Sequence, residues 1–224
     1  MNPGETTLKL INELVEEGAE HIVLLIRHSA REYEPGRHDL LNPLTDEGRR
    51  LARQLGSQIP KSLNLRAYSS PPERCIETAS LIMQGHEDNG GVIMRNRVVE
   101  GLGVFYVLDQ MKMFMAMQEA GGMVNFQRDW FSGNVPSDIL MPARTSAEII
   151  AKLALEKLNE KPNRPQLDLM VSHDFTLYLI KDQLLGQNSA RYPDVIYLDG
   201  IAMFERNGKT FIQSHHEPAI ELKF

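Results

Sequence analysis

Two histidines, each next to charged residues, directly follow apolar, β-prone runs near opposite ends of the chain. Residues 27–31 (RHSAR) follow the run 22–26, and residues 172–174 (SHD) follow the run 167–171. Ligands of open α/β sheets collect at the carboxyl ends of the strands. We therefore expect both stretches to meet at one sheet edge, where histidine and arginine side chains could hold a phosphate group and attack it.

The first of these histidines, His28, has the chemistry of a nucleophile toward phosphorus. A neutral imidazole is available near pH 7 and can form a covalent intermediate. The reaction also needs cations around the phosphoryl group, and the candidates for charge-assisted, bidentate contacts are Arg27, Arg31 and Arg74. Arg74 follows a second predicted strand and stands in the first turn of a helix, where the helix dipole favours an anion.

The second histidine, His173, could donate a hydrogen bond to the phosphoryl oxygens. Its neighbour Asp174 is a candidate proton donor to the leaving oxygen, and Glu100, at the end of a third predicted strand, is the competing candidate. General acid–base catalysis of this kind contributes about 10²–10⁴-fold. The residues alone leave the choice between the two carboxyl groups open.

The composition fits one α/β domain spanning residues 1–224. The chain is 42% hydrophobic and 24% charged, which is ordinary for a globular protein. Its net charge of -6 argues against a nucleic-acid partner, because affinity for the phosphate backbone needs clustered Lys and Arg. The single cysteine, Cys75, excludes an intrachain disulfide.

The chain has no sequence signal for secretion or for a membrane. Residues 1–7 (MNPGETT) lack the basic region and apolar core of a typical secretory signal. No apolar stretch approaches the ~18 residues that a membrane-spanning helix needs. We therefore expect a cytoplasmic protein with no membrane partner, whose partner is a small phosphorylated substrate or a phosphoprotein.

Predicted strands and helices alternate along the chain. Strands are expected over 21–27, 65–69, 92–99 and 167–172, followed by a hairpin over 201–205 and 210–214 with Asn207-Gly208 at its turn. Thr45 is the expected N-cap of one helix, and residues 145–148 (TSAE) form a capping box that is expected to start another. The alternation predicts a three-layer α/β/α sandwich with a mostly parallel central sheet.

Residues 101–142 interrupt this alternation and are interpreted as a small helical insertion over the site. They contain a Met-rich helical run over 111–117, whose methionines we expect to form the insertion's core. Trp130 and Phe131 are expected in a polar loop. The loop after the nucleophile holds Arg37 and His38, which are further candidates for substrate contact.

The chain resembles the histidine phosphatase superfamily, which includes the phosphoglycerate mutases and the histidine acid phosphatases. The similarity rests on four ordered motifs that cover nearly the whole chain: residues 27–28 (RH), 44–48 (LTDEG), 68–79 (YSSPPERCIETA) and 172–174 (SHD). Together they are far more specific than any one of them. The resemblance implies a phosphoglycerate mutase-like fold.

By resemblance, His28 is the residue that becomes phosphorylated, and Arg27, Arg74 and His173 complete the phosphate pocket. Arg31 and the run 173–177 (HDFTL) look like the acid phosphatase branch, which points to Asp174 as the proton donor. The short length and the scarcity of cysteine look like the mutase-type branch, which points to Glu100. We favour Asp174 and keep Glu100 open.

The chain departs from the family pattern at two places. Ser29 stands where the family usually has glycine, which adds bulk beside the nucleophile and removes glycine's access to positive φ. The extended mutase motif is absent, because residues 31–35 read REYEP. This second departure favours net hydrolysis over phosphoryl transfer between substrate positions.

The predicted function is a metal-independent phosphatase that acts on a phosphomonoester through a phosphohistidine on His28, with no cofactor. An alternative is a weakly active or inactive module that binds a phosphorylated ligand, and a phosphomutase is less favoured. His215 and His216 do not suggest a metal site, because adjacent residues on a strand point to opposite faces.

Overall fold

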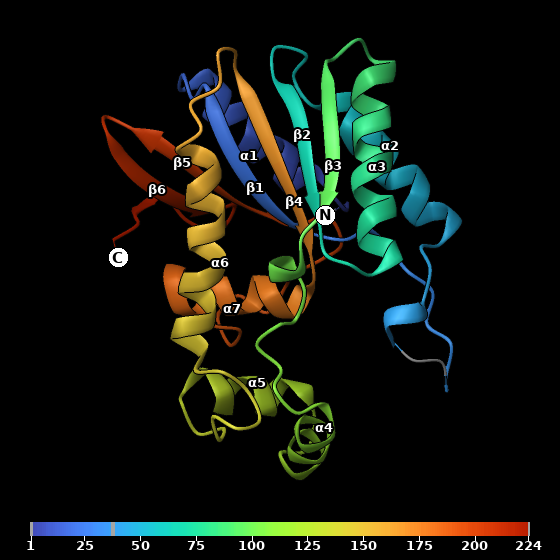
Figure 1. Cartoon of the computed structure of the whole chain (residues 1–224), viewed down its shortest axis with the longest axis vertical. Coiled ribbons are helices and arrows are strands. Elements are labelled where there is room, and N and C mark those ends of the chain that lie inside the picture. The colour runs from blue at the N-terminus through green and yellow to red at the C-terminus, as the bar shows by residue number, and fades with distance from the viewer. Residues whose placement is uncertain (1, 37–38, 224) are drawn as a thin grey trace.

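The central element is one mixed β-sheet, with its first four strands parallel. The computed structural model describes residues 2–36 and 39–223. Within this part of the chain the strand order is β3-β2-β4-β1-β5-β6-β7, and β5 to β7 run antiparallel to their neighbours (Figure 1). The strand bounds are β1 His21–Arg27, β2 Asn64–Ser69, β3 Ile93–Val98, β4 Gln166–Ser172, β5 Gly200–Arg206, β6 Lys209–Ser214 and β7 Ile220–Glu221.

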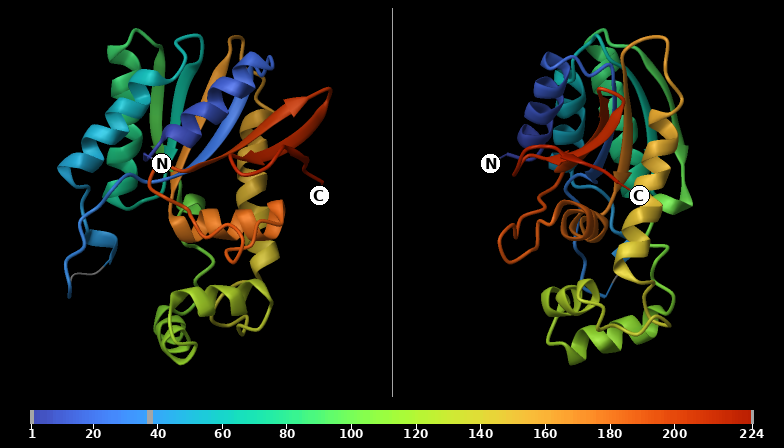
Figure 2. Two further views of the ribbon diagram at one scale, coloured as in Figure 1. Left: turned by 180° about the vertical axis from the view of Figure 1, so that it is seen from behind. Right: turned by 90° about the vertical axis from the view of Figure 1, so that its left-hand side faces the viewer.

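Helices cover both faces of the sheet, which confirms the expected three layers. The edge-on view in Figure 2 places α1 and α2 on one side of the sheet and α6 on the other. The helical bounds are α1 Glu5–Glu16, η1 Asp39–Leu41, α2 Asp46–Gln58, α3 Glu73–Asp88, η2 Glu100–Leu102, α4 Gln110–Glu119, α5 Met123–Phe131, α6 Ala143–Leu158 and α7 Asp174–Leu185. None of the helices in the described ranges is both long and apolar enough to cross a membrane.

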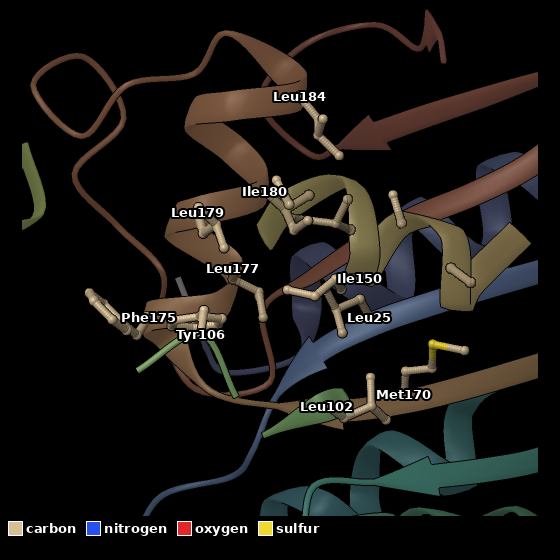
Figure 3. Packing of buried hydrophobic residues seen from close by; sticks show 14 of the residues in the cluster. Leu25, Leu102, Tyr106, Ile150, Met170, Phe175, Leu177, Leu179, Ile180 and Leu184 are labelled. Atoms are coloured by element: carbon tan, nitrogen blue, oxygen red, sulfur yellow. The ribbon is translucent and has the colours of Figure 1, made fainter. Parts of the chain in front are cut away.

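Strand β1 is apolar at every position from 22 to 26 because both of its faces are buried. Ile22, Leu24 and Ile26 belong to the hydrophobic cluster formed with α1, α2 and α3. Val23 and Leu25 belong to the cluster formed with α6 and α7, part of which Figure 3 shows around Leu25. A strand covered on both faces loses the usual alternation of apolar and polar residues.

Helices α2 and α3 approach closely because two glycines lie at their contact. A Cβ atom added at Gly56 would lie 1.9 Å from the backbone oxygen of Ile82, and one at Gly85 would lie 2.0 Å from that of Arg53. No side chain fits at either position. The two glycines therefore set the distance between these helices, and with it the position of the α3 N-terminus.

Buried aromatic rings form the centre of the segment between η2 and α6. Trp130 lies in α5, is 1% exposed and stacks on Phe175 at 5.1 Å between ring centroids. Its expected place in a polar loop is therefore wrong. The expected methionine core is also wrong for Met111 and Met115, which are 70% and 50% exposed. Met113 and Met117 of the same helix are partly buried and pack against the cluster, as expected.

The start of α6 also differs from the sequence prediction. The helix begins at Ala143, with Pro142 as its N-cap and no side-chain cap, so residues 145–148 lie inside the helix. The hydroxyl of Ser146 donates to the backbone oxygen of Pro142. Pro142 sits just before the first turn, where no backbone N–H is needed, and this overrides the capping box. The expected Thr45 cap and the Asn207-Gly208 hairpin are confirmed.

The sheet carries a buried ion network near the amino ends of its parallel strands. Arg66 on β2 donates from Nε and Nη2 to Asp168 on β4, at 2.6 and 2.9 Å. His21 Nε2 lies 2.8 Å from the same carboxylate. Although burial opposes ionisation, the hydrogen bonds from His21 and Arg66 hold the pKa of Asp168 below its ordinary value. This network lies at the end of the strands opposite to the histidines.

Candidate active site

The pairing of β1 with β4 brings the two histidines together. Arg27 pairs with Ser172 in the parallel register, so His28 and His173 leave neighbouring strands at the same level. The backbone N–H of His28 donates to the oxygen of Ser172 at 2.9 Å. The two imidazole rings meet edge to face, with centroids 5.7 Å apart. The structure therefore unites the two motifs at the predicted sheet edge.

Arg74 reaches the histidines from a third strand end. Strand β2 pairs with β4 up to Ser69 and Val171, and α3 begins four residues later. The guanidinium Nε of Arg74 donates to His28 Nε2 at 3.1 Å, and its Nη2 lies 3.4 Å from His173 Nδ1. The arginine is 3% exposed. Its fixed positive charge is thus placed against both imidazole rings.

The hydrogen bonds of His28 define which nitrogen could attack. Its Nδ1 lies 2.8 Å from the carbonyl oxygen of Ser29, so Nδ1 carries the proton and donates to that oxygen. The lone pair is left on Nε2, on the side of Arg74. Burial, together with the charge of Arg74, holds the pKa of His28 well below its ordinary value. His28 is therefore a neutral imidazole whose Nε2 carries the lone pair, which accepts a hydrogen bond from Arg74 in this structure.

His173 has both ring nitrogens engaged by protein groups. Its Nε2 lies 2.8 Å from the hydroxyl oxygen of Ser70, and its Nδ1 faces Arg74. Burial, and then the charge of Arg74, lowers the pKa of His173 to about 4. Ser70 was missed as a site residue by the sequence reasoning, although it stands inside the motif 68–79. Its place directly after the β2 strand end was the available signal.

Ser29 stands in place of the family's usual glycine, but the expected disturbance of the geometry beside the nucleophile does not occur. Its backbone does not have positive φ, and its hydroxyl donates to the oxygen of Gly48 at 2.7 Å. Its N–H donates to Thr78 at 3.1 Å. A Cβ atom at Gly48 would lie 2.0 Å from the oxygen of Ala30, so the motif 44–48 needs this glycine. The serine therefore ties the nucleophile loop to α2 and α3.

Arg27 and Asp174 form an ion pair beside the histidines. The Nη2 of Arg27 lies 2.8 Å from the carboxylate of Asp174, and its Nη1 donates to the oxygen of Val195 at 2.7 Å. The guanidinium also covers the ring of Tyr197 at 4.1 Å, a contact that no sequence pattern indicated. Asp174 is the first residue of α7, with His173 as the N-cap.

Glu100 begins the short helix η2, directly beyond β3 and Val99. That helix is attached to the end of β4, because the hydroxyl of Ser172 donates to the oxygen of Leu102 at 2.7 Å. Within the described residues, no hydrogen bond links the Glu100 carboxylate to His28 or His173. Asp174 is thus tied to a pocket arginine, whereas Glu100 is exposed and forms no such ion pair within the part of the chain that the structure describes.

Arg31 contacts the site through an acidic residue that the sequence did not single out. Its Nη2 lies 2.5 Å from Oδ1 of Asp39, and the other carboxylate oxygen lies 3.2 Å from Nη2 of Arg74. Asp39 stands in an irregular loop with no periodic pattern, so nothing in the sequence pointed to it. Arg37 and His38, the other loop candidates, lie outside the described residues.

No group of three or more His, Cys, Asp or Glu side chains suitable for a metal ion occurs in residues 2–36 and 39–223. His215 and His216 do not lie on a strand, contrary to the expectation from the sequence. Strand β6 ends at Ser214, and the two rings lie side by side in the following turn with centroids 3.9 Å apart. His216 Nε2 faces the ammonium of Lys181 at 3.0 Å, and His215 faces Asp199.

The sequence matches the model of the histidine phosphatase superfamily (branch 1) over residues 23–203. This range contains all four motifs and every candidate site residue. The superfamily includes phosphatases, so the comparison supports phosphatase chemistry at a coarse level. No curated protein matches the chain.

Solved structures of similar fold include a phosphoglycerate mutase from Bacillus anthracis, with 19% identity, a TM-score of 0.55 and coverage of 89% of this chain and 94% of that one. A phosphoserine phosphatase mutant from Entamoeba histolytica, in complex with phosphoserine, has 18% identity, a TM-score of 0.54 and coverage of 88% and 100%. A mycobacterial glucosyl-3-phosphoglycerate phosphatase has 17% identity, a TM-score of 0.53 and coverage of 81% and 89%. At such identities the similarity shows the fold.

Proposed function

The chain belongs to the histidine phosphatase superfamily, and from that premise we propose that it is a metal-independent phosphatase acting on phosphomonoesters through a phosphohistidine on His28. The observation that carries the proposal is the neutral, buried His28, whose Nε2 lone pair faces Arg74 at 3.1 Å. A small phosphorylated molecule or a phosphoprotein would be the substrate. The names of two similar structures, a phosphoserine phosphatase and a glucosyl-3-phosphoglycerate phosphatase, are consistent with this class.

The proposed reaction has two steps. His28 Nε2 attacks phosphorus, the N–P bond forms as the ester P–O bond breaks, and the leaving oxygen takes a proton from Asp174 or Glu100. The same carboxylate then removes a proton from water, whose oxygen attacks phosphorus as the N–P bond breaks. Arg27, Arg31 and Arg74 with His173 would hold the phosphoryl oxygens in both steps, so each group returns to its starting state.

The first test is covalent labelling of the nucleophile. We expect a radioactive phosphoester to label the wild-type protein with an acid-labile, base-stable phosphate, and the His28→Ala variant to lose both label and turnover. His86→Gln is the matched control, since His86 is buried in α3 and bonds the backbone of Leu63 instead of the site. Full phosphatase activity in His28→Ala would refute the proposal.

The proton donor can be identified from the leaving group. An alkyl phosphate needs protonation of its leaving oxygen, whereas p-nitrophenolate leaves without it. Replacement of the donor should therefore lower turnover of the alkyl ester by about 10²–10⁴-fold and spare the p-nitrophenyl ester. Asp174→Asn and Glu100→Gln serve as controls for each other. The sequence motif 173–177 favours Asp174, while the ion pair of Asp174 with Arg27 engages its carboxylate and keeps Glu100 as the competing candidate.

A second candidate is a module that binds a phosphorylated ligand without turnover. It is favoured by one observation: carboxylates of the protein already occupy Arg27, Arg31 and Arg74. Absence of turnover on a broad phosphoester panel from pH 4 to 8, combined with thermal stabilisation by phosphate, would support this candidate. A mutase would instead move the phosphoryl group between positions of one substrate, and release of free phosphate alone would exclude it for that substrate.

A further inference from the structure

The carboxylate of Asp39 lies between two arginines of the candidate phosphate pocket. Its Oδ1 is 2.5 Å from Arg31 and its Oδ2 is 3.2 Å from Arg74. The Nη1 of Arg74 also donates to the backbone oxygen of Asp39 at 2.8 Å. Arg74 is 3% exposed, whereas the Asp39 side chain is 54% exposed. An accessible acid thus neutralises a buried cation next to the nucleophile.

The Asp39 carboxylate lies where the phosphoryl oxygens of the substrate are expected to bind. The same guanidinium of Arg74 contacts His28 through Nε and faces His173 through Nη2. Guanidinium groups bind carboxylate and phosphate oxygens through the same planar N–H edges. The Asp39 carboxylate and a bound phosphate would therefore need the same N–H donors of Arg31 and Arg74.

We propose that Asp39 is an internal anion that competes with the phosphoryl group for Arg31 and Arg74, and so determines which anions the pocket accepts. The inference rests on the proposed phosphatase function and adds a specificity residue to it. A carboxylate carries one negative charge and a phosphomonoester dianion carries two. The dianion displaces Asp39, whereas singly charged anions compete poorly with a carboxylate that is covalently attached to the chain.

The local structure around Asp39 permits this exchange. The carboxylate sits at the start of η1, a single turn over Asp39–Leu41 in which Leu41 is 64% exposed. None of the three residues of η1 is buried. A turn with so little buried apolar surface has a small free energy of local opening. Displacement of the carboxylate therefore leaves the hydrophobic core intact.

The opposite role, in which Asp39 positions Arg74 for catalysis, predicts different kinetics. Loss of a competing anion strengthens ground-state binding, so KM and the inhibition constants fall while kcat is kept. Loss of a positioning residue misaligns the guanidinium in the transition state, so kcat falls. The two roles therefore separate in one set of measurements.

The test compares Asp39→Asn with wild type, using p-nitrophenyl phosphate as substrate and inorganic phosphate and orthovanadate as competitive inhibitors. We expect KM and both inhibition constants to fall about two- to fivefold, as for loss of a partly exposed ion-pair interaction, with kcat retained. Asp39→Glu keeps the charge and should stay near wild type. Asp88→Asn is the matched control, because it removes the same charge from a surface ion pair with Arg53 at the C-terminal end of α3. Equal or higher inhibition constants in Asp39→Asn overturn the inference.

A crystal structure of the wild-type protein with orthovanadate gives an independent test that needs no variant to fold. We expect vanadate oxygens on Arg31 and Arg74 and the Asp39 carboxylate displaced from both. Vanadate bound while Asp39 remains on both arginines overturns the inference, even when His28 is labelled by the phosphoester. Absence of both labelling and inhibition in wild type instead refutes the phosphatase function, and the inference with it.

Discussion

The two histidines of the site differ in what their ring nitrogens contact, and the proposed roles rest on that difference. His28 donates from Nδ1 to a backbone carbonyl, and its Nε2 accepts from Arg74 Nε. His173 has a hydroxyl on one nitrogen and a guanidinium on the other. The sequence predicted the pair and its strand ends. It could not predict these partners, because Ser70 and Arg74 come from a different strand and helix.

The buried state of His173 makes the fold sensitive to acid. Its pKa is about 4 in the native protein and 6.5 for an exposed imidazole. Between these values the unfolded chain binds a proton that the native protein does not, so stability falls as the pH drops through this window. By pH 4 the loss reaches about 3 kcal/mol for this one group. Denaturant unfolding at several pH values between 7 and 4 measures it.

The His173→Gln variant is the control for this acid sensitivity. It lacks the titrating group, so the slope of the unfolding free energy against pH should decrease by about 1.4 kcal/mol per pH unit near pH 5. His28 also has a depressed pKa and contributes to the slope that remains. An identical slope in the variant and the wild type would contradict the assignment of the acid sensitivity to His173.

At the scale of elements, α2 determines where the nucleophile loop lies. The N-terminal turn of α2 packs against the loop through Gly48, and Thr45 caps that turn by accepting from the Gly48 N–H at 2.8 Å. Ser29 and Thr45 both contact this corner. We therefore expect the motif 44–48 to affect catalysis by positioning His28.

Replacement of Gly48 by alanine tests that positioning. Alanine favours a helix by about 1 kcal/mol over glycine, but its Cβ would lie 2.0 Å from the oxygen of Ala30, which forces the backbone to shift. Such overpacking costs about 1–3 kcal/mol, so we expect lower stability and a larger fall in kcat than in substrate affinity. Gln54→Ala, on the exposed face of the same helix, is the control. Unchanged kcat in Gly48→Ala would refute the positioning role.

The sequence predicted the elements that carry strong local signals. The strands, the three-layer order, the Thr45 cap and the Asn207-Gly208 hairpin depend on apolar runs or on turn residues. It missed the start of α6 and the place of Trp130, because tertiary packing overrides local patterns there. It missed Asp39 because an irregular loop has no periodicity that shows where a side chain points.

At the scale of the whole molecule, the candidate active site and a buried ion network lie at opposite ends of the parallel strands. Their carboxyl ends carry the histidines, and the buried ion network of Arg66, Asp168 and His21 lies near their amino ends. A buried, fully hydrogen-bonded pair is costly to break, since removal of one partner leaves the other charge buried and unpaired. Disruption of the network is therefore expected to lower the free energy of unfolding without changing kcat.

The Asp168→Asn variant tests this separation. We expect a loss of about 3–5 kcal/mol in unfolding free energy, with kcat of the folded protein close to wild type. The control is Asp88→Asn, because Asp88 pairs with Arg53 on the surface and should contribute less than about 1 kcal/mol. A fall in kcat of Asp168→Asn, measured where the protein is fully folded, would show that the two ends of the strands are coupled.

The register of β1 with β4 has a consequence for the timing of folding. Arg27 and Ser172 pair although they lie far apart in the chain, and β2 lies on the other side of β4. The strand that joins the two halves of the pocket is thus the fourth in sequence order. During synthesis, a chain that ends before residue 166 holds the nucleophile and Arg74 but lacks the strand that separates and aligns them. Such long-range pairings form late and slowly. We therefore expect the nascent protein to gain its candidate phosphate pocket only after β4 has been synthesised.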